Sequence, residues 1–272
     1  MKFKNKYKLE IIFCIIGLFL IFYPFVSDYI NSLNTSKVID EKEKQINKND
    51  SNEYKEVIEE INKYNESLME RENAFKLDND QKEKYNMLLD MDGNGYMGYI
   101  TIDNIGVKLP IYHGTDETTL SKNVGHLEWS SLPIGGKGTH AVLSAHTGQV
   151  NNRMFSDLKK LKIGDLFSIH ILGQELRYEV EEIKTIDPSD NSDLYIDSNK
   201  DLVTLFTCTP YGINTHRLLV RGHRVIDNKE YSGFSSNAYI INKYIEALLL
   251  SIIPICLFII IKTKQNKKKK VL

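Results

Sequence analysis

The most reactive side chain in the polar part of this sequence is the thiol of Cys208, in the stretch VTLFTCTPYGINTHRLLVRG (residues 203–222). The other two of the 3 cysteines, Cys14 and Cys256, lie in long apolar runs, where a cysteine behaves as a small hydrophobic residue. A disulfide framework is therefore excluded. Two interpretations of Cys208 remain open, a buried structural thiol and a reactive nucleophile.

As a nucleophile, Cys208 would need neighbouring groups that complete the chemistry. A free thiol has a pKa of about 8.5, so a nearby cation must favour the thiolate at neutral pH. Acyl transfer also requires donors for the oxyanion of the tetrahedral intermediate and an acid for the leaving amine. Arg217 follows the loop after Cys208, and a hairpin would return it beside the thiol. Arg221 lies about 13 Å further along the same run. A solvated strand position is the alternative for both arginines.

The acid should be a histidine, and the sequence contains 7 of them. His146 ends the apparent strand THAVLSAH, and the ends of strands are common positions for reactive groups on a β scaffold. Spacing alone leaves His146, His140 and His216 as comparable candidates.

We predict no metal site and no other cofactor. The histidines and cysteines form no HxxxH or CxxC pair, which argues against zinc. Residues 90–101 begin like a calcium-binding loop, but Thr101 stands where a bidentate glutamate is required. A glycine-rich turn into a strand explains these residues more simply.

The element types that must position these groups are mainly β-strands. From Gly98 to about residue 226, short β-branched runs alternate with Gly, Pro, Asp and Asn. The runs are GYITIDNIGVKLPIY, THAVLSAH, LFSIHIL, LRYEVEEIKTI, LVTLFTC and HRLLVRGHRV. Because no helical segments alternate with them, the pattern favours an antiparallel sandwich or closed barrel over a doubly wound sheet. A chain of about 130 residues is long enough for one such core.

The residues before this β region are polar and helical in pattern. Between about residues 36 and 89, apolar side chains recur at three- and four-residue spacing among many Lys, Glu, Asn and Asp. This spacing predicts one or two exposed amphipathic helices. The stretch EKEKQINKNDSNE is polar enough to be partly disordered.

Two apolar runs flank the polar region and predict membrane spans. The first, Ile11–Val26, is slightly shorter than the roughly 20 residues of a spanning helix, so a signal peptide is the alternative to an anchor. No small-residue cleavage site follows it, which favours an uncleaved anchor. The second, Tyr244–Ile261, runs into a lysine-rich tail.

Lysines lie on the terminal side of each apolar run, and the positive-inside rule keeps those sides in the cytoplasm. The region between the runs is then extracellular and the protein lies in the cell membrane. The net charge of −1 suggests no nucleic-acid partner. We divide the chain into a cytoplasmic N-terminus (1–8), a transmembrane anchor (9–28), a helical extracellular region (29–90), a β-domain (91–228), a linker (229–243), a transmembrane helix (244–262) and a cytoplasmic tail (263–272).

At this point the motifs resemble those of a known family. TLFTC (204–208) is similar to the Thr-Leu-x-Thr-Cys signature of sortases, the membrane-anchored cysteine transpeptidases of Gram-positive bacteria. The stretches VKLPIYHGT, VGHLEWSSLPIGGKGTHAVLSAH and MFSDLKKLKIGD, together with the segment around Cys208, resemble the class C branch, which polymerises pilins. The likeness extends over roughly residues 86–226, and a C-terminal span is also typical of that branch.

The resemblance implies a fold and a set of roles. The fold is an eight-stranded β-barrel with an N-terminal helical region that carries a lid, and here two transmembrane helices flank it. Cys208 matches the nucleophile, His146 the general acid, and Arg217 the arginine that steadies the oxyanion or the substrate. The resemblance thus selects among the histidines, which spacing could not do.

Two departures from the family pattern affect substrate contacts. After the catalytic histidine the family usually reads Gly-His-Arg-Gly-Leu-Pro, whereas this chain has AHTGQV. Class C enzymes also carry an Asp-Pro-aromatic lid, and the nearest counterpart here is Asn73-Ala74-Phe75. Because the carboxylate is lost, such a lid should hold less tightly. The alternative is that Asn73 and Phe75 belong to an ordinary helix end.

The expected activity is cleavage of a Leu-Pro-x-Thr-Gly-like sorting signal between Thr and Gly, through a thioacyl enzyme. A lysine amine of another pilin subunit would then resolve the intermediate and extend a pilus. Two alternatives remain: a sortase that attaches surface proteins to peptidoglycan amines, and a non-catalytic membrane scaffold that binds pilins. The partners expected in all three cases are pilins or surface proteins and the lipid bilayer.

Overall fold

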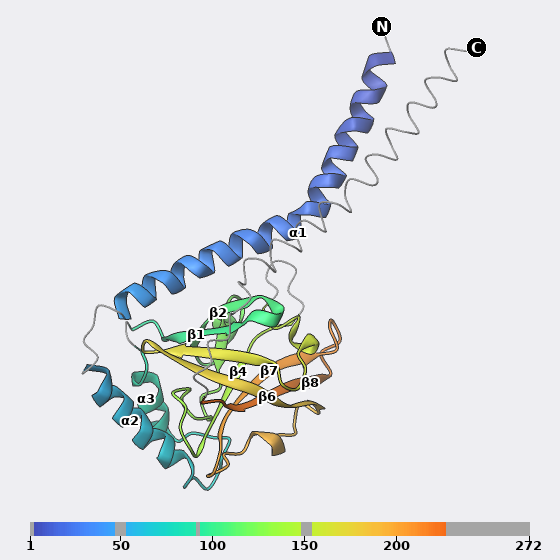
Figure 1. The fold of residues 1–272 in the computed structure, drawn as a ribbon. Coiled ribbons are helices and arrows are strands. Elements are labelled where there is room, and N and C mark those ends of the chain that lie inside the picture. The colour runs from blue at the N-terminus through green and yellow to red at the C-terminus, as the bar shows by residue number, and fades with distance from the viewer. Residues whose placement is uncertain (1–2, 47–52, 91–92, 148–153, 227–272) are drawn as a thin grey trace.

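The computed structural model describes residues 3–46, 53–90, 93–147 and 154–226. The described residues form a long N-terminal helix, three shorter α-helices and a closed β-barrel (Figure 1). The predicted linker (229–243), C-terminal span (244–262) and basic tail (263–272) lie outside the described residues.

The barrel has the strand order β1-β2-β3-β4-β7-β8-β6-β5. Its strands are β1 (Tyr96–Ile102), β2 (Val107–His113), β3 (Val124–His126), β4 (Thr139–Ser144), β5 (Leu166–Ile171), β6 (Gln174–Ile186), β7 (Asp201–Thr209) and β8 (His216–Arg224). The closed, mainly β architecture predicted from the sequence is confirmed. The all-antiparallel pairing is wrong in two places, because β2–β3 and β4–β7 pair in parallel. Periodicity reports the exposure of a strand and does not report its partner.

Alternate residues of β4, β7 and β8 fill the barrel. The inward side chains include Leu143, Leu205 and Val220, all of which are buried in the main core. Side chains of opposite parity point outward, and some of them form a second apolar group on the barrel surface, which we call the outer cluster. Its members are Val142, Ile186, Leu194 and Leu219, with Phe75, Leu127, Trp129 and Phe206 packed against them.

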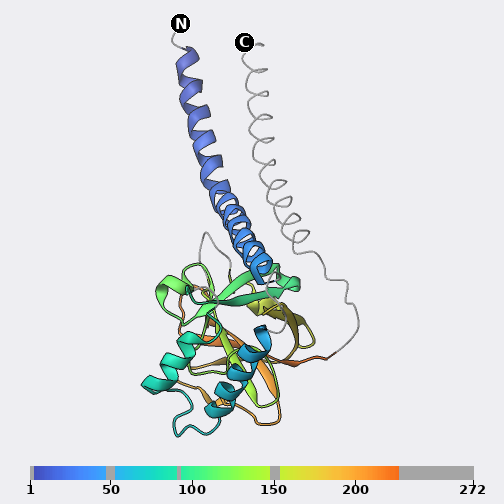
Figure 2. The same cartoon turned by 90° about the vertical axis from the view of Figure 1, so that its left-hand side faces the viewer.

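Helices α2 (Glu53–Leu68) and α3 (Asn79–Met87) lie next to each other on one side of the barrel (Figures 1 and 2). The apolar stripe of α2 packs on the barrel core instead of standing free, with Ile61 and Leu68 buried. Asn65 of the same helix forms two hydrogen bonds with the backbone of Leu132, at 2.8 and 3.1 Å.

Helix α3 is fixed at both ends. Asp78 and Gln81 form a capping box at its start, which satisfies free backbone N–H groups there. Near its end, the buried Tyr85 hydroxyl lies 3.1 Å from Nδ1 of His126 and accepts a hydrogen bond from the N–H of Gly114. The connection between α2 and α3, which we call the 69–78 segment, is therefore held at both sides by helices that are anchored on the barrel.

Helix α1 (Phe3–Ile46) passes without interruption through the predicted boundaries at residues 8 and 28. Its C-terminal part lies on β1 and β2, where Ile39 is buried, Tyr99 donates a hydrogen bond to Glu43, and Lys108 forms an ion pair with Asp40 at 3.4 Å. Among the described residues, no helix has a stretch both long and apolar enough to cross a membrane. The anchor predicted at 9–28 stays a prediction.

Candidate active site

The hairpin of β7 and β8 places Cys208 opposite Arg217. The antiparallel register pairs these two residues directly. Leu205 on β7 and Leu218 on β8 belong to the barrel core, so alternation turns both Cys208 and Arg217 to the outer face. The Cβ atoms of directly opposed residues are about 4.5–5.5 Å apart, which brings the thiol and the base of the arginine side chain together.

The parallel pairing of β4 with β7 brings His146 to the same place. Ser144 on β4 is paired with Phe206 on β7. His146 lies two residues after Ser144, and Cys208 lies two residues after Phe206. Both steps preserve parity, so this register directs the His146 side chain toward the outer face beside Cys208.

Two hydrogen bonds continue the β4–β7 pairing past the end of β4. The N–H of Ala145 donates to the carbonyl of Phe206 at 3.2 Å, and the buried Thr207 hydroxyl donates to the carbonyl of Ala145 at 2.7 Å. The carbonyl of His146 accepts a hydrogen bond from the N–H of Phe155 at 3.2 Å. The backbone on either side of His146 is therefore fixed, although residues 148–153 lie outside the described part of the chain.

The structure separates the three histidines that spacing left open. His140 is fully buried, and both of its ring nitrogens lie within hydrogen-bond distance of a partner. His216 is exposed at the start of β8, next to Arg217, so alternation directs it to the face opposite that of Cys208. Of the three, only His146 has the position that the general acid requires. Its catalytic role stays a prediction.

Arg217 is held by the loop that precedes β8. Its Nη1 donates to the carbonyls of Asn214 and His216, at 3.1 Å each. Nε and Nη2 are not part of these bonds and can approach an oxyanion that forms on the Cys208 side. Cys208 itself is partly exposed, as a nucleophile must be to reach a peptide.

Glu117 is a charged neighbour that the sequence did not predict. It is the first residue of the short helix α4 (Glu117–Leu120), and its Oε2 lies 3.5 Å from Nε2 of His146. The carboxylate attracts the imidazole in its protonated form, which is the form that donates a proton. The Glu117 side chain is 81% exposed, so water screens this attraction. No motif links residues so far apart in sequence, and only the fold brings them together.

The 69–78 segment covers part of the outer face next to Cys208. The Phe75 ring makes edge contacts with Trp129 and Tyr195, at centroid distances of 5.0 and 4.7 Å. It packs on the outer cluster, which also contains Phe206, the residue that precedes Cys208 by two on the same face. Asn73 accepts a hydrogen bond from the N–H of Phe75 at 3.1 Å, so its amide shapes the turn.

Arg71 attaches this segment to the barrel. Its Nη2 donates to the carbonyl of Trp129 at 2.7 Å, and its Nε donates to the carbonyl of Leu68 at 3.1 Å. Sequence reasoning missed this anchor because the acceptors are backbone carbonyls, which have no sequence signature. The segment borders a cavity of about 470 Å³ between α2 and the connection from β6 to β7, with Glu72, Ala74, Ser130 and Ile196 among its lining residues.

In the described residues, no group of three or more His, Cys, Asp or Glu side chains could hold a metal ion. Asp90, which begins the calcium-like stretch, accepts a hydrogen bond from the N–H of Gly95 at 2.7 Å. That bond shapes the turn into β1. Acid–base groups and hydrogen-bond donors are the chemistry that this site provides.

Comparison with known proteins agrees with this geometry. Residues 100–225 match the sortase domain family. The chain is 32% identical over 131 residues to sortase D of Bacillus subtilis (strain 168), which is 47% of this chain and 63% of that protein, so the match spans less than two thirds of that relative. Sortase C1 from Streptococcus agalactiae has a solved structure that matches with 45% identity and a TM-score of 0.67, covering 71% of this chain and all of that chain.

A second solved structure, sortase C of Clostridium perfringens with the C-terminal cell wall sorting motif, matches with 44% identity and a TM-score of 0.62. The match covers 71% of this chain and 100% of that chain. The chain belongs to the sortase family of cysteine transpeptidases, and the two solved structures named here are class C members. The expected eight-stranded sortase barrel is thereby confirmed.

We predict distinct losses for the three candidate catalytic residues. Cys208→Ala should abolish cleavage of a Leu-Pro-x-Thr-Gly peptide, because the nucleophile is removed. His146→Ala should lower kcat by about 10²–10⁴-fold, the usual contribution of a general acid. Arg217→Lys should also be severely impaired, because an ammonium does not reproduce a planar fork of donors. A fluorogenic peptide and the full-length protein in detergent provide the measurement.

His216→Ala is the matched control for these variants, because it removes an adjacent histidine that alternation directs to the other face. It should keep most of the activity. A dead His216 variant beside an active His146 variant would overturn the assignment of the acid.

We also predict that the 69–78 segment limits access to Cys208. When a segment covers the site, the apparent reactivity of the thiol is its intrinsic reactivity multiplied by the fraction of molecules in which the segment is open. Phe75→Ala and Arg71→Met should therefore increase the rate at which a thiol reagent modifies Cys208. The modified peptide can be followed by mass spectrometry on the full-length chain, which separates it from the peptides of Cys14 and Cys256.

Met87→Ala is the control for this experiment, because Met87 is an exposed apolar residue on α3. It should leave the rate unchanged. Equal rates for Phe75→Ala, Arg71→Met and Met87→Ala would mean that the 69–78 segment does not guard the site.

Proposed function

We propose that this chain is a pilin-polymerising sortase, which cleaves a Leu-Pro-x-Thr-Gly-like sorting signal between Thr and Gly and joins the threonine to a lysine amine. The observation that carries the proposal is the register of β7. It pairs Cys208 with Arg217 on β8, and it aligns Phe206 with Ser144 at the end of β4, two residues before His146. The similarity to solved class C enzymes supports the same choice.

In the first step, the Cys208 thiolate attacks the carbonyl carbon of the threonine. The carbonyl oxygen becomes an oxyanion, to which Arg217 donates hydrogen bonds. His146 then protonates the glycine nitrogen as the peptide bond breaks, and a thioester to Cys208 remains.

In the second step, an amine attacks the thioester. His146 is now neutral and accepts the proton of the amine as the new amide bond forms. The Cys208 thiolate leaves and is ready for another cycle. Neither step requires a cofactor, and an oxidised cysteine could not begin the first.

The outer cluster would receive the apolar part of the sorting signal. Phe206 and Leu219 lie on the same face as Cys208, within two residues of Cys208 and Arg217 on their strands. The solved Clostridium perfringens relative was determined with a C-terminal cell wall sorting motif. Phe75 now covers this surface, so we propose that the 69–78 segment acts as a lid that the substrate displaces.

The two alternatives are less well supported. Attachment of surface proteins to peptidoglycan amines uses the same chemistry, but the two solved neighbours that match at 45% and 44% identity are class C enzymes. A scaffold that only binds pilins has no use for Cys208, His146 and Arg217 on one face of the barrel. The two candidate enzymes, a pilin-polymerising sortase and a cell-wall sortase, therefore differ in the amine that accepts the acyl group.

We further propose that the barrel acts outside the cell membrane and that both termini are cytoplasmic. Lysines at the terminal sides of the two apolar sequence runs support this topology. Protease added to intact protoplasts should then remove the barrel and spare a tag placed after Leu272. Digestion of that tag from outside would contradict the proposal.

The proposed function predicts a preference among acceptors. The full-length protein should join a Leu-Pro-x-Thr-Gly peptide to a lysine-containing pilin domain at least about tenfold faster than to a peptidoglycan cross-bridge amine, a difference of about 1.4 kcal/mol in activation free energy. Mass spectrometry of the product would locate the isopeptide bond. Cys208→Ala serves as the control.

A product with the cross-bridge amine alone would favour the cell-wall sortase. No cleavage with either acceptor would favour the scaffold.

A further inference from the structure

The connection from β6 to β7, residues 187–200, forms one wall of the proposed substrate site. Leu194 belongs to the outer cluster, and the Tyr195 ring contacts Phe75. Both residues also line the cavity of about 470 Å³ beside the 69–78 segment. The position of this connection therefore determines the shape of the surface that a sorting signal would meet.

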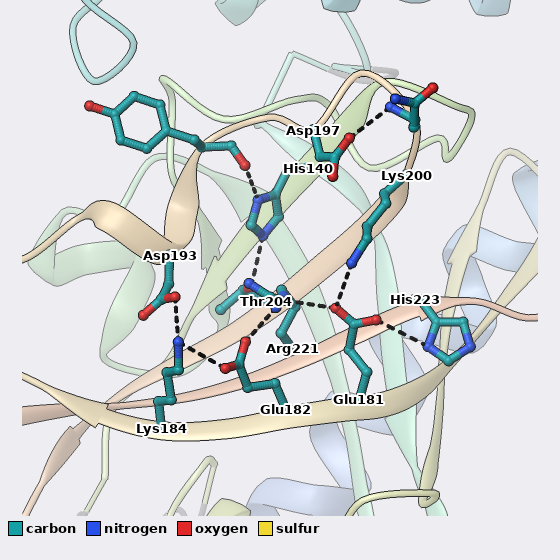
Figure 3. A network of polar contacts seen from close by, with 12 residues as sticks. His140, Glu181, Glu182, Lys184, Asp193, Asp197, Lys200, Thr204, Arg221 and His223 are labelled. Atoms are coloured by element: carbon teal, nitrogen blue, oxygen red, sulfur yellow. Dashed lines mark hydrogen bonds and ion pairs between the residues drawn. The ribbon is translucent and has the colours of Figure 1, made fainter.

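At its end, the connection is held to the barrel by Lys200, whose carbonyl accepts hydrogen bonds from the N–H groups of Gly138 and Thr139. Around residues 193–195, it is held by one ion pair and by one bond to a buried side chain. Near its short helical turn η3 (Ser192–Leu194), Asp193 forms an ion pair with Lys184 of β6 at 2.7 Å. The Lys184 side chain is 43% exposed, so water weakens that pair. The buried side chain is that of His140, whose Nδ1 lies 2.9 Å from the carbonyl oxygen of Tyr195 (Figure 3).

The partners of His140 fix the position of its proton. A carbonyl oxygen can only accept, so Nδ1 carries the proton and donates to Tyr195. The other ring nitrogen, Nε2, lies 2.8 Å from the hydroxyl of Thr204. In a neutral ring this nitrogen accepts, and the Thr204 hydroxyl donates to it. Thr204 is buried on β7, so the imidazole bridges a barrel strand and the 187–200 connection.

The surroundings of His140 keep the ring neutral. Burial lowers the pKa of His140 to about 4, and the positive charge of Arg221 acts in the same direction. The hydrogen bond to the Tyr195 carbonyl and the charge of Glu181 raise the pKa, but less than burial lowers it. Glu181 is paired with Arg221 at 2.9 Å, and Glu182 is a second partner of that arginine. Figure 3 shows this charged network on the strands beside His140. At neutral pH the ring therefore keeps one proton, and the Tyr195 carbonyl, which can only accept, places it on Nδ1.

We propose that His140 is a positioning residue for sorting-signal binding: its Nδ1–H fixes the Tyr195 carbonyl, and the Thr204 hydroxyl holds the ring in place by donating to Nε2. The inference rests on the proposed function, because it assigns the 187–200 connection to the peptide site. It also gives the first threonine of TLFTC a role that is distinct from the chemistry at Cys208. His140 acts on binding through Tyr195 and does not touch the reacting atoms.

Two substitutions of His140 distinguish this role from a general structural one. The amide nitrogen of an asparagine lies close to the position of Nδ1, so His140→Asn keeps the donor to Tyr195. The amide of a glutamine lies close to Nε2, so His140→Gln keeps a partner for Thr204 and loses that donor. We expect His140→Gln to raise KM for a sorting-signal peptide by about tenfold with kcat nearly unchanged, and His140→Asn to stay within about threefold of the wild type.

The single tryptophan of the chain provides a second readout that does not depend on turnover. Trp129 contacts Phe75, which in turn contacts Tyr195. If the connection moves, Trp129 meets more water, and its emission should shift to longer wavelength. The full-length protein in detergent should show this shift for His140→Gln and no shift for His140→Asn.

Thr204→Val and Thr204→Ser form a matched pair for the other side of the imidazole. Valine keeps the shape of the buried side chain without the hydroxyl, so it should raise KM in the same direction as His140→Gln. Serine keeps the hydroxyl and should behave as the wild type. This pair also tests the proposal if a His140 variant does not fold.

Three results would overturn the proposal. The first is an unchanged KM and an unchanged Trp129 emission in His140→Gln. The second is an equal loss in His140→Asn and His140→Gln, which would indicate a general packing role. The third is a lowered kcat at constant KM. Failure of the proposed function looks different, because the wild type itself would then cleave no sorting-signal peptide while the emission shifts would still report the position of the connection.

Discussion

The arrangement of the candidate active site depends on the pairing of β7 with two neighbours at once. On one side β7 pairs in parallel with β4, and on the other it pairs antiparallel with β8. Side chains alternate between the faces of a strand, so a slip of one residue would turn Cys208 into the barrel and Thr207 outward. The buried side chains of Val203 and Leu205 oppose such a slip, because it would expose them to water. The apolar core thus fixes the position of the nucleophile.

Three successive outward residues of β7 carry three different tasks. Thr204 contacts His140, Phe206 contributes to the outer cluster, and Cys208 lies opposite Arg217. A single strand in a single register therefore determines the position of the substrate wall, of its apolar surface and of the nucleophile. The neighbouring strand β4 repeats this order, with His140, Val142 and the approach to His146 on the same face.

Part of this could be predicted from the sequence. The β-branched runs indicated a mainly β fold, and the motifs around Cys208 indicated a sortase barrel with its candidate residues. The parallel pairing of β4 with β7 could not be predicted, because alternation describes the exposure of each strand and not its neighbour. The same limit left His140, His146 and His216 open until a family resemblance selected one.

Other features depend on contacts that have no sequence signature. Arg71 binds a backbone carbonyl, and Glu117 reaches His146 from a distant turn. The span predicted at 9–28 stays a prediction, and the predicted C-terminal span lies outside the described residues. The lid interpretation of Asn73-Ala74-Phe75 stays a prediction, and in the structure Phe75 packs on the outer cluster, which also contains Phe206.

Disulfide trapping tests the register of β7 and β8 most directly. Directly opposed residues in an antiparallel pair have Cα atoms about 4.5–5.5 Å apart, which is within the range that a disulfide spans. Under mild oxidation, Arg217→Cys should form a disulfide with Cys208, and peptide mass spectrometry would identify it. His216→Cys, one residue away and directed to the other face, should remain unlinked to Cys208. A link from position 216 with none from position 217 would contradict the register on which the account depends.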